Sequence, residues 1–389
     1  MKTFFCFLLA LTLTLFGCAS GTNPDPEVTK TVAPDDPDTE TKAPDTNTDT
    51  EPSTDTATKP DRIDEIIASM TLEEKVGQLI LVRIDSDPDT AIKNVGKYHV
   101  GGYVLFGSDF SDRNPATAAD YIKSLQDASK IPLIIATDEE GGTVVRVSKY
   151  PQYRSSPFES PRNLLEKNRV ESDTKERCKL LSSLGINLNL APVADISTDK
   201  NDFIYYRSAG DVDAAVEYVK TFVESSEGVG TTLKHFPGYG GNADTHTGTA
   251  TDTREREVFD TRDFLPFKAG IEAGADVVMV SHNTVVCMDK DNPASLSAEV
   301  HRVLREELGF DGIITTDDLA MDAISKVYGA GEAGVMAIEA GNDLVCCSDL
   351  KTKYDAILKA AKSGRITEER IDESLRRILA FKINQGIIE

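Results

Sequence analysis

The chain has 389 residues and a formal net charge of −23 at pH 7. This length allows one large or two medium domains, enough to bury a sizeable core. The acidic excess argues against nucleic acid or an anionic lipid surface as a partner, because both would repel the chain.

Residues 1–18 have the pattern of an export signal. A basic start at Lys2 precedes an apolar run from Phe4 to Phe16 that is too short to span a bilayer. The run ends in L-F-G-C-A at 15–19, which resembles a bacterial lipobox, with Phe16 where a small residue is usual. We predict a lipoprotein signal peptide with Cys18 as the lipidated first residue of the mature protein. The alternative is an ordinary secretory signal with a chance cysteine, and both place the protein outside the cytoplasm.

Residues 19–60 are predicted to be a disordered tether between the membrane and a folded domain at 61–389. From 21 to 60, Asp, Thr and Pro dominate, aromatic residues are absent, and ten acidic residues outnumber three lysines. Such a segment cannot bury enough apolar surface to offset the entropy lost on ordering.

Four cysteines remain beyond the signal and Cys18. They are Cys178, Cys287, Cys346 and Cys347, and no pair of them has metal-ligand spacing. We expect buried free thiols rather than a disulfide framework.

Beyond Asp61, short apolar runs alternate with helical stretches. Thr71 and Glu74 have the spacing of a capping box, which predicts a helix start. The expected strands are 78–83, 102–106, 133–137, 187–192, 231–235, 276–281, 312–316 and 343–346. The expected helices include 116–128, 213–225, 264–273, 298–308 and 367–382, the last as a closing helix.

Continuous apolar strands separated by helices indicate a parallel sheet buried on both faces. Eight such strands favour an α/β fold, a single-domain (β/α)₈ TIM barrel. A doubly wound sheet is the alternative, but no Gly-rich nucleotide fingerprint follows the first strand.

Ionisable side chains are concentrated at the ends of the expected strands, while the strand interiors carry almost none. In a barrel of this kind the chemistry gathers at the carboxyl ends of the strands. These residues could converge on a polyhydroxylated ring, although each alone could be a capping group. They are Asp138, Asp195, Lys234, His235, His282 and Asp317.

The stretch L-K-H-F-P-G-Y-G-G-N-A-D-T-H-T at 233–247 is the most informative motif. A strand ends in Lys234-His235 and breaks into a Gly-rich loop, which allows backbone to approach a ligand closely. The loop closes with Asp244 and His246, a pair in which a carboxylate can hold one imidazole nitrogen and raise the basicity of the other. The alternative is a structural turn.

This stretch resembles the K-H-F-P-G-x-G…D-[ST]-H signature of the β-N-acetylglucosaminidase subgroup of glycoside hydrolase family 3. The resemblance implies that His246 is the general acid/base, that Asp244 orients it, and that Lys234 and His235 bind sugar hydroxyls. One departure is visible, because three residues separate Gly240 from Asp244 where the commoner pattern has four.

Two further segments resemble substrate-binding elements of the family. I-A-T-D-E-E-G-G-T-V-V-R at 135–146 is similar to D-x-E-G-G-x-V-x-R, which implies that Asp138 and Arg146 bind sugar hydroxyls. Its two glycines predict a sharp turn that returns Arg146 over the barrel mouth, and a structural ion pair is the alternative for Arg146. Y-R-S at 206–208 is similar to a substrate-binding R-S element and implies that Arg207 binds substrate.

The stretch G-I-I-T-T-D-D-L-A-M at 312–321 resembles the nucleophile strand of the family. The position after the [ST] residue implies that Asp317 is the nucleophile. Asp318 would then begin the following helix, although the sequence leaves the opposite assignment of the pair open.

The resemblance covers the chain from about Ile63 onward. It implies a retaining, exo-acting β-N-acetylhexosaminidase that uses no cofactor or metal and releases terminal N-acetylglucosamine from glycans such as peptidoglycan fragments. The alternatives are a β-glucosidase or β-xylosidase and a His-assisted phosphorylase of the same family. Two further alternatives remain open. One is a metal-dependent barrel hydrolase with His235, Asp244 and His246 as ligands, and the other is a non-catalytic sugar-binding surface lipoprotein. The sequence does not identify protein partners.

Overall fold

The structure, a computed structural model, describes residues 59–85 and 87–388. The predicted signal peptide, Cys18 and nearly all of the predicted tether lie outside the described residues. Those predictions therefore stay predictions.

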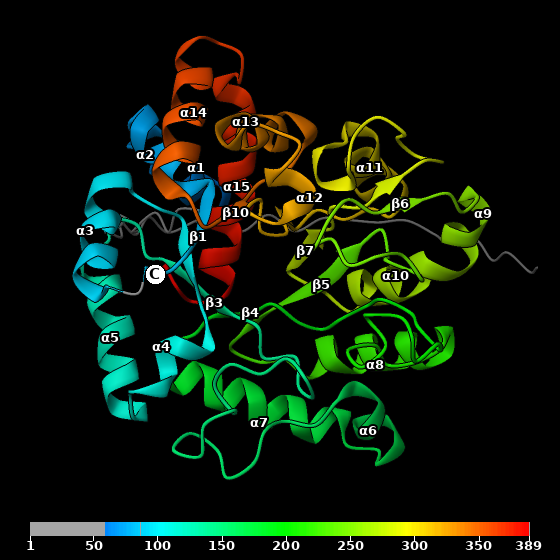
Figure 1. The fold of residues 1–389 in the computed structure, drawn as a ribbon. Coiled ribbons are helices and arrows are strands. Elements are labelled where there is room, and N and C mark those ends of the chain that lie inside the picture. Colours follow the sequence, from blue (N-terminus) through cyan, green and yellow to red (C-terminus); the bar gives the residue numbers. More distant parts are fainter. Residues whose placement is uncertain (1–58, 86, 389) are drawn as a thin grey trace, which may run out of the picture. The chain divides into compact units, whose positions relative to one another are not determined.

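Eight parallel strands form a barrel (Figure 1). They are β1 (Ile80–Arg83), β2 (Gly102–Leu105), β3 (Ile134–Thr137), β4 (Leu188–Asn189), β5 (Gly230–Phe236), β7 (Val277–Val280), β9 (Ile313–Thr316) and β10 (Val345–Cys347). Their order is β10-β1-β2-β3-β4-β5-β7-β9. A parallel bridge between Thr315 and Leu344 joins β9 to the chain just before β10 and closes the ring. The predicted (β/α)₈ barrel is confirmed.

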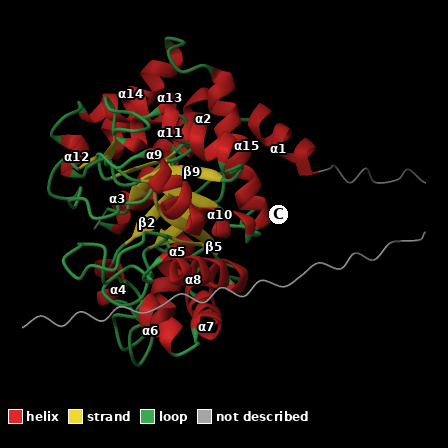
Figure 2. Cartoon of the chain, turned by 90° about the vertical axis from the view of Figure 1, so that its right-hand side faces the viewer, coloured by secondary structure: helices red, strands yellow, loops and turns green. Residues whose placement is uncertain are grey.

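Helices surround the barrel, as Figure 2 shows with the yellow strands inside the red helices. The α-helices are α1 (Lys59–Ala68), α2 (Leu72–Gln78), α3 (Pro88–Tyr98), α4 (Gly107–Ser111), α5 (Pro115–Asp127), α6 (Pro161–Glu166), α7 (Val170–Ser183), α8 (Val212–Ser225), α9 (Arg256–Val258), α10 (Phe264–Glu272), α11 (Ala298–Arg302), α12 (Asp322–Ser325), α13 (Ala330–Ala340), α14 (Leu350–Lys362) and α15 (Glu368–Asn384). The shorter turns are η1 (Phe259–Asp263) and η3 (Val303–Glu307), both π-helical, and the 3₁₀ turn η2 (Ala294–Leu296).

The predicted capping box starts α2. The Thr71 side chain accepts a hydrogen bond from the Glu74 backbone N–H at 3.3 Å, and Glu74 Oε2 accepts one from the Thr71 N–H at 2.9 Å. The α2 helix runs to Gln78, so the prediction that β1 begins there is wrong. A helix that leads directly into a buried strand presents one uninterrupted run of buried residues, here from Glu74 to Val82, and the sequence does not mark the boundary.

Two other predicted ranges need correction. The strand predicted at 187–192 contains only Leu188–Asn189, since Pro192 has no N–H to extend the ladder. The helix predicted at 298–308 is split into α11 and the π-helical η3. Both segments still occupy their predicted places in the barrel.

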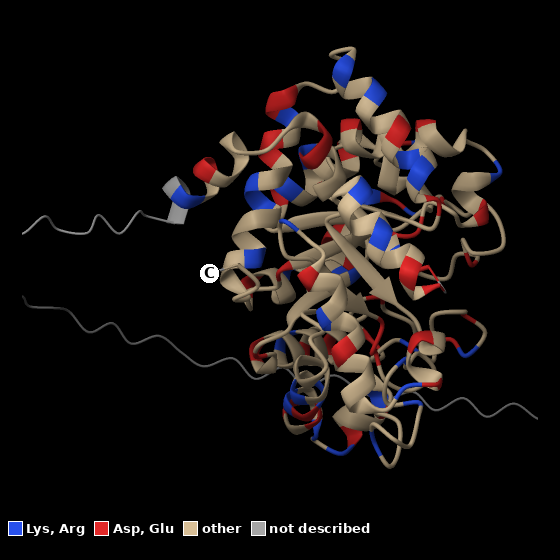
Figure 3. Cartoon of the chain, turned by 90° about the vertical axis from the view of Figure 1, so that its left-hand side faces the viewer, with Lys and Arg blue, Asp and Glu red and all other residues tan. Residues whose placement is uncertain are grey.

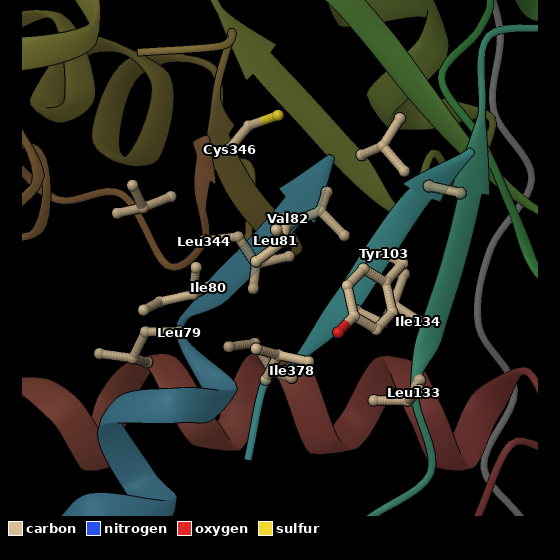
Figure 4. Close-up of a cluster of buried hydrophobic side chains, with 14 of the residues drawn as sticks. Leu79, Ile80, Leu81, Val82, Tyr103, Leu133, Ile134, Leu344, Cys346 and Ile378 are labelled. Atoms are coloured by element: carbon tan, nitrogen blue, oxygen red, sulfur yellow. The ribbon is translucent and has the colours of Figure 1, made fainter. Parts of the chain in front are cut away.

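The apolar core lies between the strands and the closing helix. Figure 4 shows Ile80, Leu81 and Val82 of β1 beside Tyr103 and Ile134, with Ile378 of α15 reaching towards them. All of these side chains are buried, as are Ile371, Leu375 and Leu379 of α15. Burial on this scale is the main term that stabilises such a fold.

The four cysteines of this region are free, and all except the partly exposed Cys287 are buried. Within residues 59–85 and 87–388, no helix is long and apolar enough to cross a membrane. The carboxyl ends of the strands carry longer connections than the amino ends. One of these connections, between β5 and β6 (Thr251–Asp252), contains the motif with Asp244 and His246, and β6 pairs with β8 (Thr284–Val285) beyond it.

Candidate active site

A cavity of about 360 Å³ opens at the carboxyl ends of the strands. Side chains from or just after all eight barrel strands line it. They include Arg83, Val104, Phe106, Asp138, Glu140, Arg146, Leu190, Arg207, Lys234, His235, His246, Met279, Asp317, Asp318 and Cys346. Two larger hollows, of about 540 and 650 Å³, are lined by none of the predicted catalytic or substrate-binding residues, and the first lies at the amino ends of β7 and β9. The chemistry-bearing residues therefore meet in the smaller cavity.

One side of the cavity is a network of alternating charges. Lys234 on β5 places its Nζ 2.7 Å from Asp138 Oδ1 and 2.7 Å from Glu140 Oε1. Arg207, in the connection after β4, donates to both oxygens of Glu140 at 2.8 and 2.9 Å. The predicted residues Asp138, Arg207 and Lys234 thus meet in one group, and Glu140 joins the two cations.

Glu140 was not among the predicted site residues, although it stands inside the motif that supplied Asp138 and Arg146. Its side chain is 2% exposed. Burial alone would raise the pKa of Glu140, but the charges of Arg207 and Lys234 outweigh it and lower the pKa below its ordinary value. The carboxylate is therefore ionised and fixes the positions of both cations. The signal available in the sequence was the position of Glu140, which is the Glu of the D-x-E-G-G-x-V-x-R element.

The connection after β3 turns sharply, as predicted. Gly141 and Gly142 have φ of +94° and +64°, and a side chain at Gly141 would collide with the Glu159 carbonyl. Glu139 accepts hydrogen bonds from the backbone N–H groups of Arg146 and Val147 at 2.8 and 2.7 Å, which holds the returning segment.

Arg146 combines the two roles that the sequence left open, a structural ion pair and a position in the sugar-binding cavity. Its Nη2 lies 3.3 Å from Asp138 Oδ2, and its guanidinium lies over the Phe106 ring at 5.2 Å. It also lines the cavity, and its buried Nε has no hydrogen-bond partner among the described residues. A donor left unpaired at a cavity wall is suited to binding a hydroxyl.

His235 is held by two neighbours. Its Nδ1 lies 2.7 Å from Asp195 Oδ2, and its Nε2 lies 3.2 Å from Arg207 Nη2. Since an arginine can only donate, Nε2 accepts and Nδ1 carries the proton towards Asp195. Asp195 is buried behind the cavity, so it orients His235 without lining the cavity itself.

Asp317 lies directly after β9 at the base of the cavity. Burial disfavours its charged form, but its polar surroundings outweigh burial and lower the pKa of Asp317, and the Asp318 N–H donates to Asp317 Oδ1 at 2.8 Å. The side chain is an ionised carboxylate at neutral pH, the state that a nucleophile needs.

Asp318 and His282 support this strand end. The prediction that Asp318 begins the following helix is wrong, because α12 starts at Asp322. Asp318 instead accepts hydrogen bonds from the N–H of Ala320 at 2.9 Å and from the Ser348 hydroxyl at 2.7 Å. The hydrogen bond from Ala320 N–H forms an Asx-type turn. In this turn the Asp318 carboxylate satisfies a nearby backbone donor, as it would do at the start of a helix. His282 is buried behind the cavity and its Nε2 contacts the Asp318 carbonyl at 3.1 Å.

The Asp244–His246 pair lies at the cavity mouth. His246 Nδ1 is 2.7 Å from Asp244 Oδ1, which also accepts the His246 backbone N–H at 3.0 Å. The His246 side chain is 56% exposed and lines the cavity, which leaves Nε2 available for proton transfer. No group of three or more His, Cys, Asp or Glu residues in the described part of the chain is arranged to hold a metal ion.

A (β/α)₈ barrel with an ionised carboxylate, a carboxylate-oriented histidine and paired charges in one cavity defines an enzyme that acts on sugars. The chain belongs to glycoside hydrolase family 3, since residues 71–381 match the sequence profile described as "Glycosyl hydrolase family 3 N terminal domain". It is a glycoside hydrolase.

Individual relatives agree with this assignment. "Beta-hexosaminidase LpqI" of Mycobacterium tuberculosis is 31% identical over 334 residues, which are 82% of this chain and 84% of that protein. A glycoside hydrolase family 3 beta-N-acetylglucosaminidase from Paenibacillus sp. str. FPU-7 is 34% identical with a TM-score of 0.74, covering 82% of this chain and 63% of that one. A beta-glucoside phosphorylase, BglX, is 25% identical with a TM-score of 0.74, covering 84% of this chain and 61% of that one.

Proposed function

We propose that the protein is a retaining, exo-acting β-N-acetylglucosaminidase that removes terminal β-linked N-acetylglucosamine. The observation that carries the proposal is the convergence of Asp317 and His246 on one cavity, with His246 oriented by Asp244. The names of the beta-hexosaminidase and beta-N-acetylglucosaminidase relatives support the choice of sugar.

Asp317 attacks the anomeric carbon while His246 donates a proton to the leaving oxygen. This step breaks the glycosidic bond and forms a covalent glycosyl-aspartate. His246 then takes a proton from a water molecule that attacks the same carbon, and the sugar leaves with its configuration retained. Asp244 stabilises the imidazolium that donates the proton in the first step and that forms again in the second.

The network around Glu140 binds the terminal sugar. Lys234, Arg207 and Arg146 supply donors to hydroxyl oxygens, and Asp138 accepts from hydroxyl groups. Because these charges are paired with one another, the cavity presents hydrogen-bonding groups with little excess charge, which suits a neutral sugar.

We also propose that the protein is lipid-anchored outside the cytoplasm and acts on peptidoglycan fragments. The lipobox-like segment ending at Cys18 and the predicted tether support the location. The resemblance to the β-N-acetylglucosaminidase subgroup supports the substrate class.

The decisive assay compares an aryl β-N-acetylglucosaminide with an aryl β-glucoside, with and without inorganic phosphate and a chelator. We expect faster turnover of the N-acetylglucosaminide, free sugar as the product, and no effect of the chelator. Preference for the glucoside would reject the sugar assignment. Formation of a sugar 1-phosphate would favour phosphorolysis, the second candidate, which the similarity to BglX makes worth testing.

A mechanism-based fluorosugar tests the nucleophile separately. We expect the label on Asp317, and Asp317→Asn should lose both labelling and turnover. A label on Asp318 would reverse the assignment of the pair.

A further inference from the structure

Tyr239 lies between the two functional halves of the cavity. It follows the sugar-binding residues of β5 by four positions and precedes the Asp244–His246 pair. Its side chain is 1% exposed, and its hydroxyl lies 2.5 Å from Thr245 Oγ1, further along the same connection between β5 and β6.

Three contacts fix the orientation of Tyr239 on the barrel. Its backbone N–H donates to Asp195 Oδ1 at 2.8 Å, while the other oxygen of Asp195 holds the His235 ring. The Tyr239 ring packs edge-on against His235 and Phe203, with centroids 5.1 and 4.8 Å apart. Burial, followed by the negative charge of Asp317, raises the pKa of Tyr239, so the phenol keeps its proton.

The loop with His246 depends on such an attachment. Asp244 holds His246, but both residues are on the same loop, so their hydrogen bond orients the ring relative to the loop and not relative to Asp317. Thr245 lies between them and is fully buried. Its carbonyl accepts the Ala323 N–H of α12 at 3.3 Å, close to the nucleophile strand.

The start of the loop is anchored elsewhere. Arg254 donates to the Gly238 carbonyl at 3.2 Å and pairs with Asp252 and Asp263. A side chain at Gly240 would collide with the Arg254 guanidinium. This anchor lies several residues before His246, so the Tyr239–Thr245 hydroxyl pair is the side-chain attachment next to the histidine.

We propose that Tyr239 is a positioning residue for the acid/base. Through its contact with Thr245, Tyr239 holds His246 at the position relative to Asp317 that proton transfer requires. Through its contact with Asp195, Tyr239 fixes this position relative to the sugar-binding side of the cavity. The inference rests on the proposed function, because it assumes that His246 transfers the proton. The substrate class is an aryl or glycosyl β-N-acetylglucosaminide whose leaving oxygen needs protonation.

The test is Tyr239→Phe, which removes only the hydroxyl, assayed on aryl β-N-acetylglucosaminides with leaving groups of graded acidity. For poor leaving groups we expect kcat/KM to fall about three- to tenfold, the effect of one hydrogen bond on a reacting geometry. For strongly activated leaving groups, which need little protonation, we expect no change. The dependence of rate on leaving-group acidity should therefore become steeper.

Thr245→Val removes the other hydroxyl and should give the same pattern. The double variant Tyr239→Phe with Thr245→Val should lose no more than either single variant, because both delete one interaction. Tyr103→Phe is the matched control, since Tyr103 is equally buried on β2 and its hydroxyl donates to the Ala91 carbonyl at 2.8 Å. Any change that Tyr103→Phe makes in kcat/KM should be the same for every leaving group.

A uniform loss across leaving groups, or no loss, in Tyr239→Phe and Thr245→Val would overturn the inference. His246→Gly in the same series separates this failure from failure of the proposed function. If His246→Gly steepens the leaving-group dependence and the hydroxyl variants do not, only the positioning role is wrong. If His246→Gly itself shows no such dependence, the acid/base assignment is wrong.

Discussion

A single buried carboxylate, that of Glu140, fixes two cations that line the cavity. Arg207 and Lys234 would otherwise repel each other across a short distance, and each would need its own counter-charge. Removing one partner of a buried ion pair leaves a charge without a counter-charge. The loss is costly because water does not reach the buried charge to replace the partner.

Glu140→Gln should therefore raise KM more than tenfold with a smaller change in kcat, because the cations lose their positions before the chemical step. It should also remove part of the acid sensitivity of the fold. The folded pKa of Glu140 is depressed, so its stabilisation is present above the ordinary value of 4.5 and is lost as pH falls below it. Steady-state kinetics and unfolding at pH 7 and pH 4 measure both effects. The surface substitution Glu332→Gln, which leaves Arg365 paired with Glu339, is the control.

His246 is predicted to serve both steps of the reaction. His246→Gly should slow turnover on the order of a hundred- to ten-thousandfold. With an activated aryl leaving group, formation of the glycosyl-aspartate should survive better than its hydrolysis, so the intermediate should accumulate. Azide should then speed its release, because azide attacks without losing a proton.

Asp244→Asn should give a milder form of the same behaviour, since it keeps the imidazole but weakens its orientation and basicity. Pre-steady-state bursts and azide dependence measure these steps. Equal slowing on good and poor leaving groups with no azide effect would make His246 a binding residue instead.

At the scale of elements, the sequence predicted the barrel because each strand is a short apolar run buried on both faces. The carboxyl end of each strand is then set by topology, so Asp138, Lys234 and Asp317 were predicted to meet, and they do. The errors at Gln78 and after Asn189 are boundary errors, where burial continues beyond the hydrogen-bonded strand.

The pairings between site residues that the sequence did not predict depend on contacts distant in sequence. Glu140 meets Arg207 across 67 positions, and Asp195 meets His235 across 40. Neither pair leaves a local pattern, because the partners are brought together by the barrel alone. Local motifs therefore predicted the reacting groups and Asp244, which orients His246, while the fold itself was needed to find Glu140 and the pairing of Asp195 with His235.

The closing helix α15 contains a buried lysine. Lys382 is fully buried, and its Nζ donates to Gln78 Oε1 at 2.7 Å. Burial lowers the pKa of Lys382 from 10.5 to about 7. Between these two values the unfolded chain binds more protons than the folded one, so this residue makes stability fall as pH drops from 10.5 towards 7.

Lys382→Met should abolish that part of the pH dependence. As pH is lowered from 10.5 to 7, the free energy of unfolding of the variant should rise relative to that of the natural chain by on the order of 3 to 5 kcal/mol. The unpaired Gln78 oxygen would offset the gain by a constant amount, so the difference in slope is diagnostic. Denaturant titrations at several pH values measure it, and parallel stability curves would contradict the prediction.

At the scale of the whole molecule, Figure 3 shows acidic and basic residues interspersed over the outer helices. Surface pairs such as Arg365 with Glu332 and Glu339 balance one another, and neither charge sign dominates a whole helix layer in that view. The side drawn in that view therefore presents no basic face for binding an anionic polymer.

The catalytic domain should work without the segment before it. Every motif residue that lines the cavity lies between Asp138 and Met321. Removal of residues 1–60 should therefore leave kcat/KM within about twofold, since substitutions and deletions far from a site rarely change its energetics by more than about 0.5 kcal/mol. Purified truncated protein assayed beside the longer chain tests this, and loss of folding or catalysis would reject the tether interpretation.

Cys18 tests the predicted anchor in cells. A single lipidated cysteine at the start of the mature protein would supply enough buried acyl chain for stable membrane attachment, because each methylene contributes about 0.8 kcal/mol and bacterial lipoprotein cysteines carry more than one chain. Cys18→Ala should move the protein from the membrane fraction to the soluble extracytoplasmic fraction while kcat/KM stays the same. Cys178→Ala is a matched control, because that cysteine is buried in the barrel domain and should leave the distribution unchanged. If the Cys18→Ala protein stays with the membrane after a high-salt wash, the attachment has another origin.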